Sequence, residues 1–300
     1  MEVSSHGLVQ GRLNAVAFDC ALFTNLSHDH LDYHGTMEAY AEAKARLFDT
    51  PGLGAAVLNL DDAVGARIAR RVKGKGPRTI GYGFPDRPEV AVDEYLPAKL
   101  LAPEYTRQLG RFNVSNVLGV LGCLLSFGIG LKDAVALVAD LPPVPGRMER
   151  VGDRPLVVVD YAHTPDALEK VLQTLRPVAQ ERRGRLCVVF GAGGDRDPAK
   201  RPLMGAVATR LADRVLATSD NPRSEDPLEI IRQIGVAASE PDRARAIEGI
   251  IAQADGNDVV LIAGKGHEDY QEVAGRRLPF SDAAVARAAI ARRERSGGGQ

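Results

Sequence analysis

All six histidines of the 300-residue sequence fall in four short segments, around His6, across residues 28–34, and at His163 and His267. Histidine exchanges protons near neutral pH and binds metals, so this grouping indicates sites. Residues 28–34 (HDHLDYH) miss the H-x-H-x-D-H pattern of a binuclear hydrolase, because Tyr33 occupies its last position. Two interpretations remain open: a polar helix start with hydrogen-bonded histidines, or one histidine serving Mg²⁺ beside carboxylates.

Three polar loops that contain Gly or Pro follow expected strands in the second half. They are residues 190–197 (FGAGGDRD), 219–223 (SDNPR) and 263–269 (AGKGHED). Ligands of open parallel sheets bind beyond the carboxyl ends of the strands, so the three loops indicate one crevice. Arg196, Arg223 and Glu268 offer two cations and one anion, which suits an amino acid with its carboxylates and ammonium. Three ordinary turns with solvated charges are the alternative.

Neither glycine-rich pattern of the common nucleotide folds is complete. Residues 190–197 depart from G-x-G-x-x-G because Arg196 stands at the third glycine position. Neither residues 74–76 nor residues 264–266 (both GKG) continue as G-x-x-x-x-G-K-[ST]. An ATP site of the P-loop kind would therefore lack its phosphate cradle in this sequence.

Composition excludes several classes of protein. A net charge of −1 gives no reason to expect nucleic acid or an anionic membrane as partner, and 45% hydrophobic residues exclude global disorder. Cys20, Cys123 and Cys187 lie in separate apolar runs, which predicts buried, reduced thiols instead of a disulfide framework. The N-terminus lacks a signal-peptide pattern and the longest apolar run, residues 117–129, is too short to span a membrane. A cytoplasmic protein is expected.

The second half alternates strands and helices, which predicts a mostly parallel, doubly wound sheet. Expected strands are 155–161, 185–190, 214–218 and 258–263, and expected helices are 164–180, 202–211, 227–238, 244–254 and 282–293. The first half is less regular. It has expected strands within 15–25 and at 54–59 and 79–82, short extended pieces in 84–110, and helices at 36–49, 62–72, 112–127 and 132–141.

A proline-rich linker, residues 142–146 (PPVPG), separates the halves. We predict domains at residues 1–149 and 150–295 and a disordered tail at 296–300.

Nine segments, in order along nearly the whole chain, resemble the Mur ligases of peptidoglycan synthesis, in particular the diaminopimelate-adding members. They are residues 2–12 (EVSSHGLVQGR), 25–35 (NLSHDHLDYHG), 40–48 (YAEAKARLF), 110–116 (GRFNVSN), 145–149 (PGRME), 159–168 (VDYAHTPDAL), 190–204 (FGAGGDRDPAKRPLM), 220–223 (DNPR) and 263–271 (AGKGHEDYQ). The family has a uridine-binding domain and a G-T-x-G-K-T loop, and the resemblance places Met1 downstream of both. The implied fold is α/β: an incomplete central domain of the P-loop type, then a complete Rossmann-like C-terminal domain.

The resemblance implies an ATP- and Mg²⁺-dependent amide ligation. ATP phosphorylates the D-Glu carboxylate of UDP-MurNAc-L-Ala-D-Glu, and the amine of meso-diaminopimelate displaces phosphate from the acyl phosphate. We expect the chain alone to be impaired or inactive. The alternatives are a non-catalytic fragment, half of a split ligase with a separate N-terminal piece, or another superfamily ligase such as folylpolyglutamate synthase. The DNPR and GKGHEDYQ loops argue against the last.

The resemblance also assigns site residues. The catalytic set, which also supplies the metal ligands, is Glu2, His30 and Lys44, the last after carbamylation. Contacts to the UDP-MurNAc-peptide are assigned to Ser4, Gln10 and Arg12. Residues around the nucleotide are Asn113, Asn116, Arg147 and Asp160. The diaminopimelate pocket is assigned to Arg196, Asp220, Asn221, Arg223, Gly264 and Glu268. Physically, the Arg223 cation suits the extra carboxylate of diaminopimelate and would repel a lysine ammonium.

Overall fold

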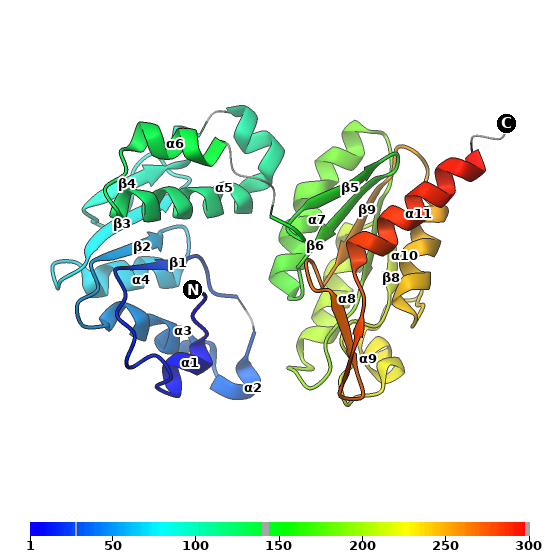
Figure 1. Ribbon diagram of the computed structural model, residues 1–300, viewed down its shortest axis with the longest axis horizontal. Coiled ribbons are helices and arrows are strands. Elements are labelled where there is room, and N and C mark those ends of the chain that lie inside the picture. The colour runs from blue at the N-terminus through cyan, green and yellow to red at the C-terminus, as the bar shows by residue number, and fades with distance from the viewer. Residues whose placement is uncertain (28, 102, 140–143, 298–300) are drawn as a thin grey trace. The chain divides into compact units, whose positions relative to one another are not determined.

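The computed structural model describes residues 1–27, 29–101, 103–139 and 144–297. The chain forms two compact units, Met1–Pro142 and Pro143–Gln300, which are described separately (Figure 1). The division precedes the expected boundary at 149/150, because the segment before it is bonded into the second unit. The amide of Gly146 donates to Glu149, and that of Met148 donates to Asp160. Pro142 and Pro143 of the expected linker lie outside the described residues.

The first unit is built on a four-stranded parallel sheet of order β1-β2-β3-β4. Its strands are β1 (Cys20–Phe23), β2 (Ala55–Asn59), β3 (Arg78–Gly83) and β4 (Glu94–Pro97). Its helices are α1 (Ser5–Val9), α2 (Leu31–His34), α3 (Met37–Ala45), η1 (Arg46–Asp49), α4 (Ala63–Val72), η2 (Ala98–Leu100), α5 (Pro103–Ser126) and α6 (Leu131–Ala139).

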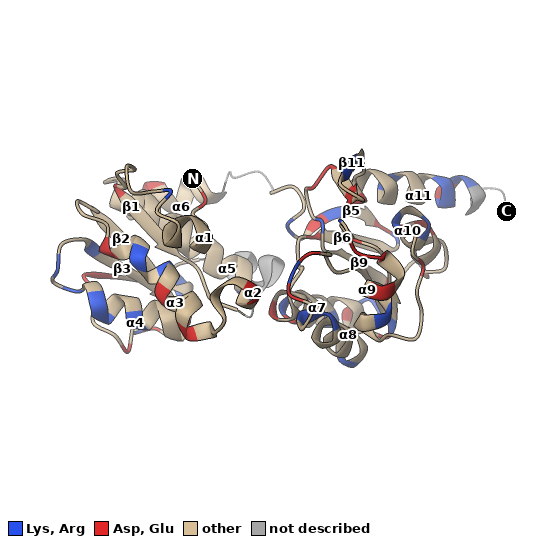
Figure 2. Cartoon of the chain, turned by 90° about the horizontal axis from the view of Figure 1, so that it is seen from below, with Lys and Arg blue, Asp and Glu red and all other residues tan. Residues whose placement is uncertain are grey.

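The central strand β2 is buried on both faces, as its continuous apolar sequence predicts. Successive side chains alternate between faces, so Ala56 and Leu58 join the core under α4, whereas Val57 joins the core under α5 and α6. Ion pairs also join α3 to α4, where basic and acidic residues face each other (Figure 2): Arg67 with Glu38 and Arg71 with Glu42.

The helix expected at 112–127 begins earlier, at Pro103, within the region expected to hold only extended pieces. Amide hydrogens in the first turn of a helix have no intrahelical acceptor, so proline, which lacks this hydrogen, costs the helix nothing there. Pro103 is therefore well suited to the first helical position. Within the described residues, no helix is long and apolar enough to span a membrane.

The second unit has a five-stranded sheet of order β5-β6-β9-β7-β8. Strands β6 (Leu156–Asp160), β9 (Val259–Ala263), β7 (Leu186–Phe190) and β8 (Arg214–Ala217) are parallel, and β5 (Glu149–Asp153) is antiparallel to β6. The helices are α7 (Pro165–Glu181), α8 (Lys200–Leu211), α9 (Pro227–Ile234), α10 (Arg243–Ala252) and α11 (Asp282–Gly297). Helices on both faces confirm the doubly wound fold (Figure 1).

Four features of the second unit differ from the sequence prediction. The strand β5 and the hairpin of β10 (Tyr270–Val273) and β11 (Arg276–Pro279) were not predicted. The helix expected at 227–238 ends at Ile234, because Gly235 takes a left-handed φ of 75° that caps it. The tail predicted to begin at residue 296 overlaps α11, which continues to Gly297. Residues 298–300 lie outside the described residues.

Candidate functional site

The loops that follow β7, β8 and β9 meet at the carboxyl end of the second sheet, as the sequence predicts. Gly193, in the loop after β7, lies against the loop after β8: a Cβ built on it would lie 3.0 Å from Nη1 of Arg223, 3.7 Å from Cγ of Arg196 and 3.9 Å from the carbonyl oxygen of Asn221. Nη1 of Arg223 also donates to the carbonyl of Gly194 at 2.7 Å. A Cβ there would crowd the end of the Arg223 side chain, so the glycine gives this side chain room beside the turn. Arg196 is exposed, and its Nη1 donates to the carbonyl of Asp195 at 3.0 Å.

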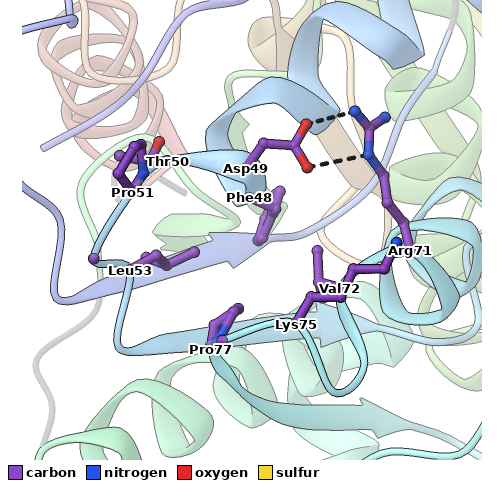
Figure 3. Close-up of a pocket in the computed structure, with 11 residues that line it drawn as sticks. Phe48, Asp49, Thr50, Pro51, Leu53, Arg71, Val72, Lys75 and Pro77 are labelled. Atoms are coloured by element: carbon purple, nitrogen blue, oxygen red, sulfur yellow. Dashed lines mark hydrogen bonds and ion pairs between the residues drawn. The ribbon is translucent and has the colours of Figure 1, made fainter.

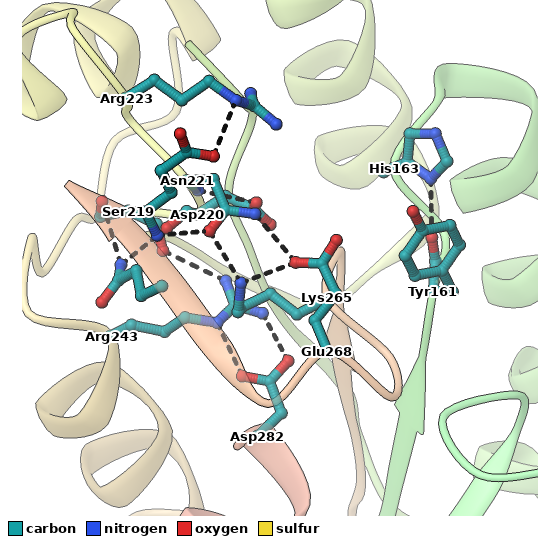
Figure 4. Close-up of polar contacts among 12 residues, drawn as sticks. Tyr161, His163, Ser219, Asp220, Asn221, Arg223, Arg243, Lys265, Glu268 and Asp282 are labelled. Atoms are coloured by element: carbon teal, nitrogen blue, oxygen red, sulfur yellow. Dashed lines mark hydrogen bonds and ion pairs between the residues drawn. The ribbon is translucent and has the colours of Figure 1, made fainter. Parts of the chain in front are cut away.

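Asn221, Lys265 and Glu268 form a closed triangle of polar contacts (Figure 4). Nδ2 of Asn221 donates to Oε2 of Glu268 at 2.8 Å. Nζ of Lys265 donates to the same carboxylate oxygen at 2.8 Å and to Oδ1 of Asn221 at 3.0 Å. The Lys265 side chain is 0% exposed, so its charge is compensated inside the protein. The sequence analysis missed Lys265, although its place three residues before Glu268 was a usable signal.

Asp220 presents an unsatisfied acceptor beside this triangle. Its Oδ1 accepts the amide of Asn221 at 2.7 Å. Among the described residues, its buried Oδ2 has no hydrogen-bond partner. Gly264, at φ 122°, leaves room for that oxygen, since a Cβ there would lie 2.5 Å from it. A buried carboxylate oxygen without a donor suits a ligand that brings one, such as an ammonium group.

A fully buried ion pair connects the ends of β8 and β9, where two of these loops begin. Arg243 and Asp282 are each 0% exposed, and Nε and Nη2 of Arg243 donate to the two oxygens of Asp282, both at 2.7 Å. The same guanidinium donates to the carbonyls of Ser219 at 3.3 Å and Ala263 at 3.0 Å (Figure 4). Arg243 therefore fixes the spacing between the ends of β8 and β9. Sequence analysis did not find it.

The hairpin β10–β11 holds the backbone of Arg223. The amide of Arg223 donates to the carbonyl of Glu272, and the amide of Ala274 donates to the carbonyl of Arg223. Nε of Arg223 lies 3.4 Å from Oε2 of Glu272, and the arginine side chain is 21% exposed. The guanidinium is thus partly neutralised and still reaches the surface.

Arg147 and Asp160 lie on segments that contact the loop carrying Gly264, whose amide donates to the carbonyl of Asp160 at 3.1 Å. Burial raises the pKa of Asp160. Two hydrogen bonds oppose this shift, because the amides of Met148 and Ala162 donate to its two carboxylate oxygens at 2.8 Å each. The guanidinium of Arg147 lies 4.6 Å from the centre of the Tyr161 ring. Gly146, at φ 67°, packs on the loop: a Cβ there would lie 2.0 Å from the amide nitrogen of His267.

In the first unit, charged groups gather around Lys44 on α3. Burial lowers the pKa of Lys44, opposed by the negative charges of Glu2 and Asp29. Nε2 of His30 lies 3.7 Å from Oδ2 of Asp29, and burial also lowers the pKa of His30. The described residues contain no group of three His, Cys, Asp or Glu side chains arranged to hold a metal. The sequence analysis missed Asp29 as a member of this group.

The histidine segment also makes structural hydrogen bonds. Nε2 of His34 lies 2.9 Å from Oγ of Ser5, whereas His30 stands at the N-cap position of α2 without a side-chain capping hydrogen bond. The His6 ring lies 5.1 Å from that of His30. Both interpretations of this segment therefore remain compatible with the fold.

The other predicted residues of the first unit lie in two places. Ser4 caps α1 by accepting the amide of Gly7 at 3.1 Å, Gln10 donates to Oη of Tyr33 at 3.2 Å, and Arg12 is exposed. Asn113 and Asn116 are neighbours on α5, with Nδ2 of Asn116 3.5 Å from Oδ1 of Asn113.

A pocket of about 540 Å³ lies elsewhere, at the amino-terminal ends of β2 and β3 (Figure 3). It is lined by Phe48, Leu53, Pro77 and neighbouring residues, none of which is a predicted site residue. Its Arg71 is paired with Asp49 at 2.5 Å.

Comparison with known proteins agrees with the predicted order of domains. The family described as "Mur ligase middle domain" matches residues 1–124, and "Mur ligase, glutamate ligase domain" matches residues 146–266. A UDP-N-acetylmuramoyl-L-alanyl-D-glutamate–2,6-diaminopimelate ligase from Ectopseudomonas mendocina is 51% identical over 97% of this chain. The chain spans 63% of that relative's length.

Solved structures give the same result. A structure of a UDP-N-acetylmuramoyl-L-alanyl-D-glutamate–2,6-diaminopimelate ligase is 41% identical, with a TM-score of 0.55 over 98% of this chain and 64% of its own. A bifunctional folylpolyglutamate synthase/dihydrofolate synthase from Yersinia pestis, complexed with AMPPNP and a Mn ion, has a TM-score of 0.59 at 20% identity, over 91% of this chain and 61% of its own. At that identity the second likeness shows the fold alone.

Proposed function

The chain belongs to the Mur ligase family, and we propose that it serves the ATP-dependent, ADP-forming addition of meso-diaminopimelate to UDP-MurNAc-L-Ala-D-Glu. The observation that carries the proposal is the meeting of Arg223, Asp220, Asn221 and Glu268 where the loops after β8 and β9 join, with Arg196 on the neighbouring loop after β7. The two relatives of 51% and 41% identity bear the name of this ligase.

The charges of this pocket match those of diaminopimelate, which carries two carboxylates and two ammonium groups at neutral pH. Arg223 supplies a guanidinium that can hold a carboxylate through two parallel hydrogen bonds. Glu268 and the unpartnered Oδ2 of Asp220 supply acceptors for an ammonium. Lysine lacks the second carboxylate and would place an ammonium against Arg223, so the pocket selects by repulsion as well as by attraction.

The groups around Lys44 suit a Mg²⁺ site, because Mg²⁺ prefers oxygen ligands and Glu2 lies near enough to act on the Lys44 pKa. Burial favours the neutral amine of Lys44, which is the form that carbamylation requires, and a carbamate would add oxygen ligands. We propose Glu2, His30 and carbamylated Lys44 as the ligands. When bound, Mg²⁺ neutralises negative charge on phosphate oxygens.

The remaining assignments follow the same proposal. Asn113, Asn116, Arg147 and Asp160 are assigned to ATP, and Ser4, Gln10 and Arg12 to the UDP-MurNAc-peptide. Half of a split ligase with a separate N-terminal piece stays as the alternative, and so does a folate-type ligase. The pair of arginines beside Gly193 favours an acceptor that carries more than one carboxylate.

Calorimetric titration of the 300-residue chain tests the proposal. We expect meso-diaminopimelate to bind at least roughly tenfold more tightly than L-lysine, because a charged hydrogen bond contributes about 1.5–3 kcal/mol. Binding is the decisive measurement, since the sequence has no G-x-x-x-x-G-K-[ST] loop and amide formation by this chain is expected to be impaired. Equal affinity for the two amino acids, or turnover of a folate with glutamate, would contradict the proposal.

Lys265→Met tests whether the buried ammonium positions the pocket. Without Lys265, Asn221 and Glu268 keep their own hydrogen bond but each loses the buried ammonium that donates to it. We expect diaminopimelate affinity to fall roughly tenfold. Lys170→Met is the matched control, because Lys170 is 44% exposed in an ion pair with Asp166 on α7. Thermal melts followed by circular dichroism establish, before titration, that both variants are folded. Wild-type affinity in a folded Lys265→Met chain would show that Lys265 has no positioning role.

A further inference from the structure

A buried arginine of α8 is hydrogen-bonded to the loops that follow β7 and β8. The Arg201 side chain is 1% exposed. Its Nη1 and Nη2 donate to the two carboxylate oxygens of Glu225, both at 2.8 Å. Nη2 also donates to the carbonyl of Gly193 at 3.1 Å, and Nη1 donates to Oε1 of Gln233 at 2.7 Å. One guanidinium thus connects the glycine-rich turn after β7, the loop after β8 and helix α9.

Glu225 and Asp195 extend this connection between the same two loops. Oε1 of Glu225 accepts the amide of Asp195 at 2.6 Å, and the hydrogen bonds from Arg201 lower the pKa of Glu225, so it is ionised at neutral pH. The carboxylate of Asp195 in turn accepts the hydroxyl of Ser224 at 2.6 Å and its amide at 3.2 Å. Each loop therefore supplies a carboxylate that accepts hydrogen bonds from the other loop.

The guanidinium of Arg223 depends on this arrangement. The hairpin β10–β11 holds the backbone of Arg223, but Nη1 of its side chain donates to the carbonyl of Gly194, in the loop after β7. Both Asp195 and Arg223 have a φ of 51°. This left-handed region is unfavourable for residues that carry a side chain, so the surrounding bonds must hold it. Displacement of residues 193–195 would therefore move the carbonyl that fixes the Arg223 side chain.

We propose that Arg201, through its ion pair with Glu225, positions the guanidinium of Arg223 and so sets the selectivity for an amino acid that carries a second carboxylate. This role rests on the proposed function, because it takes Arg223 as the residue that binds this carboxylate. A bidentate arginine–carboxylate pair fixes an angle as well as a distance, which suits a positioning role. Arg201 is almost without exposed surface, so it acts through Arg223 and does not contact the ligand itself.

Arg201→Met tests this role in the 300-residue chain. Methionine fills much of the arginine's volume without a charge, and Glu225 is 32% exposed, so water can hydrate it when its cation is gone. We expect the ratio of meso-diaminopimelate affinity to L-lysine affinity, measured by calorimetric titration, to fall roughly tenfold. Arg210→Met is the matched control, because Arg210 lies on the same helix with a 58% exposed side chain paired with Glu169. This control should keep the wild-type ratio.

A second background separates positioning from general support of the fold. If Arg201 acts through Arg223, Arg201→Met should not lower diaminopimelate affinity further in an Arg223→Ala chain. A general structural role would lower the affinity by the same factor in both backgrounds. Such equal losses, or a wild-type affinity ratio in an Arg201→Met chain that thermal melts show to be folded, would overturn the role of Arg201 and leave the proposed function standing.

Hydrogen exchange of the ligand-free chains follows the loops without any amino acid present. The amides of Asp195 and Ser224, which donate to carboxylates across the two loops, should exchange faster in Arg201→Met than in the wild type. Unchanged exchange at both amides would contradict the positioning role directly. A wild-type chain that shows no preference for diaminopimelate over lysine would instead overturn the proposed function, and the selectivity assigned to Arg201 with it.

Discussion

Arg223→Ala is expected to weaken the binding of meso-diaminopimelate by roughly 100-fold and to leave ATP binding unchanged. The substitution removes the guanidinium that faces the extra carboxylate, and the preference for diaminopimelate over lysine should disappear with it. The loop itself should keep its place, because the backbone bonds of Arg223 to Glu272 and Ala274 do not involve the side chain. Titration of both amino acids and of ATP into the variant measures this split.

Two further variants define what the arginine contributes. Arg223→Lys keeps a cation but loses the planar fork, so an intermediate affinity is expected. Arg232→Ala removes a 73% exposed arginine from an ion pair on α9 of the same unit and should change nothing. Equal losses of diaminopimelate and ATP affinity in Arg223→Ala would mean that the residue supports the unit as a whole and does not select the substrate.

Strands β6, β7 and β9 were predictable because each is buried on both faces. All five residues of β6, β7 and β9 are buried, and a continuous apolar run is typical of such strands. The strands that escaped prediction lack this pattern. All four residues of β11 are exposed, and its pairing with β10 depends on the turn at Ala274 and Gly275. These segments have no periodic pattern of apolar residues, so their strands are defined only by the contacts they make in the folded protein.

The place of the candidate site was predictable, but its supports were not. Strand ends indicate where polar loops meet, and the loops after β7, β8 and β9 do meet. A charged residue, by contrast, is buried only when a distant partner compensates it. Arg243 and Arg245 stand two residues apart on α10, yet the first side chain is 0% exposed and the second 76%. The difference is set by Asp282, which local sequence cannot reveal.

Arg243→Leu is expected to destabilise the second unit by about 3–5 kcal/mol, because it leaves the Asp282 carboxylate buried without its cation. The carbonyls of Ser219 and Ala263 lose their donor in the same step. Hydrogen exchange followed by mass spectrometry measures the effect strand by strand. Amides of β8 and β9 should lose protection, while those of β2 and β3 in the first unit should keep it.

The double variant Arg243→Leu/Asp282→Leu separates the charge from the packing. Removing both charges eliminates the desolvation penalty, so the double variant should recover much of the stability that either single change loses. Arg245→Leu, at the exposed position, should match the wild type. If the double variant is as unstable as Arg243→Leu, the bonds to Ser219 and Ala263 outweigh the ion pair. Arg243 would then stabilise the site chiefly by holding the ends of β8 and β9, the strands whose loops carry Arg223 and Glu268.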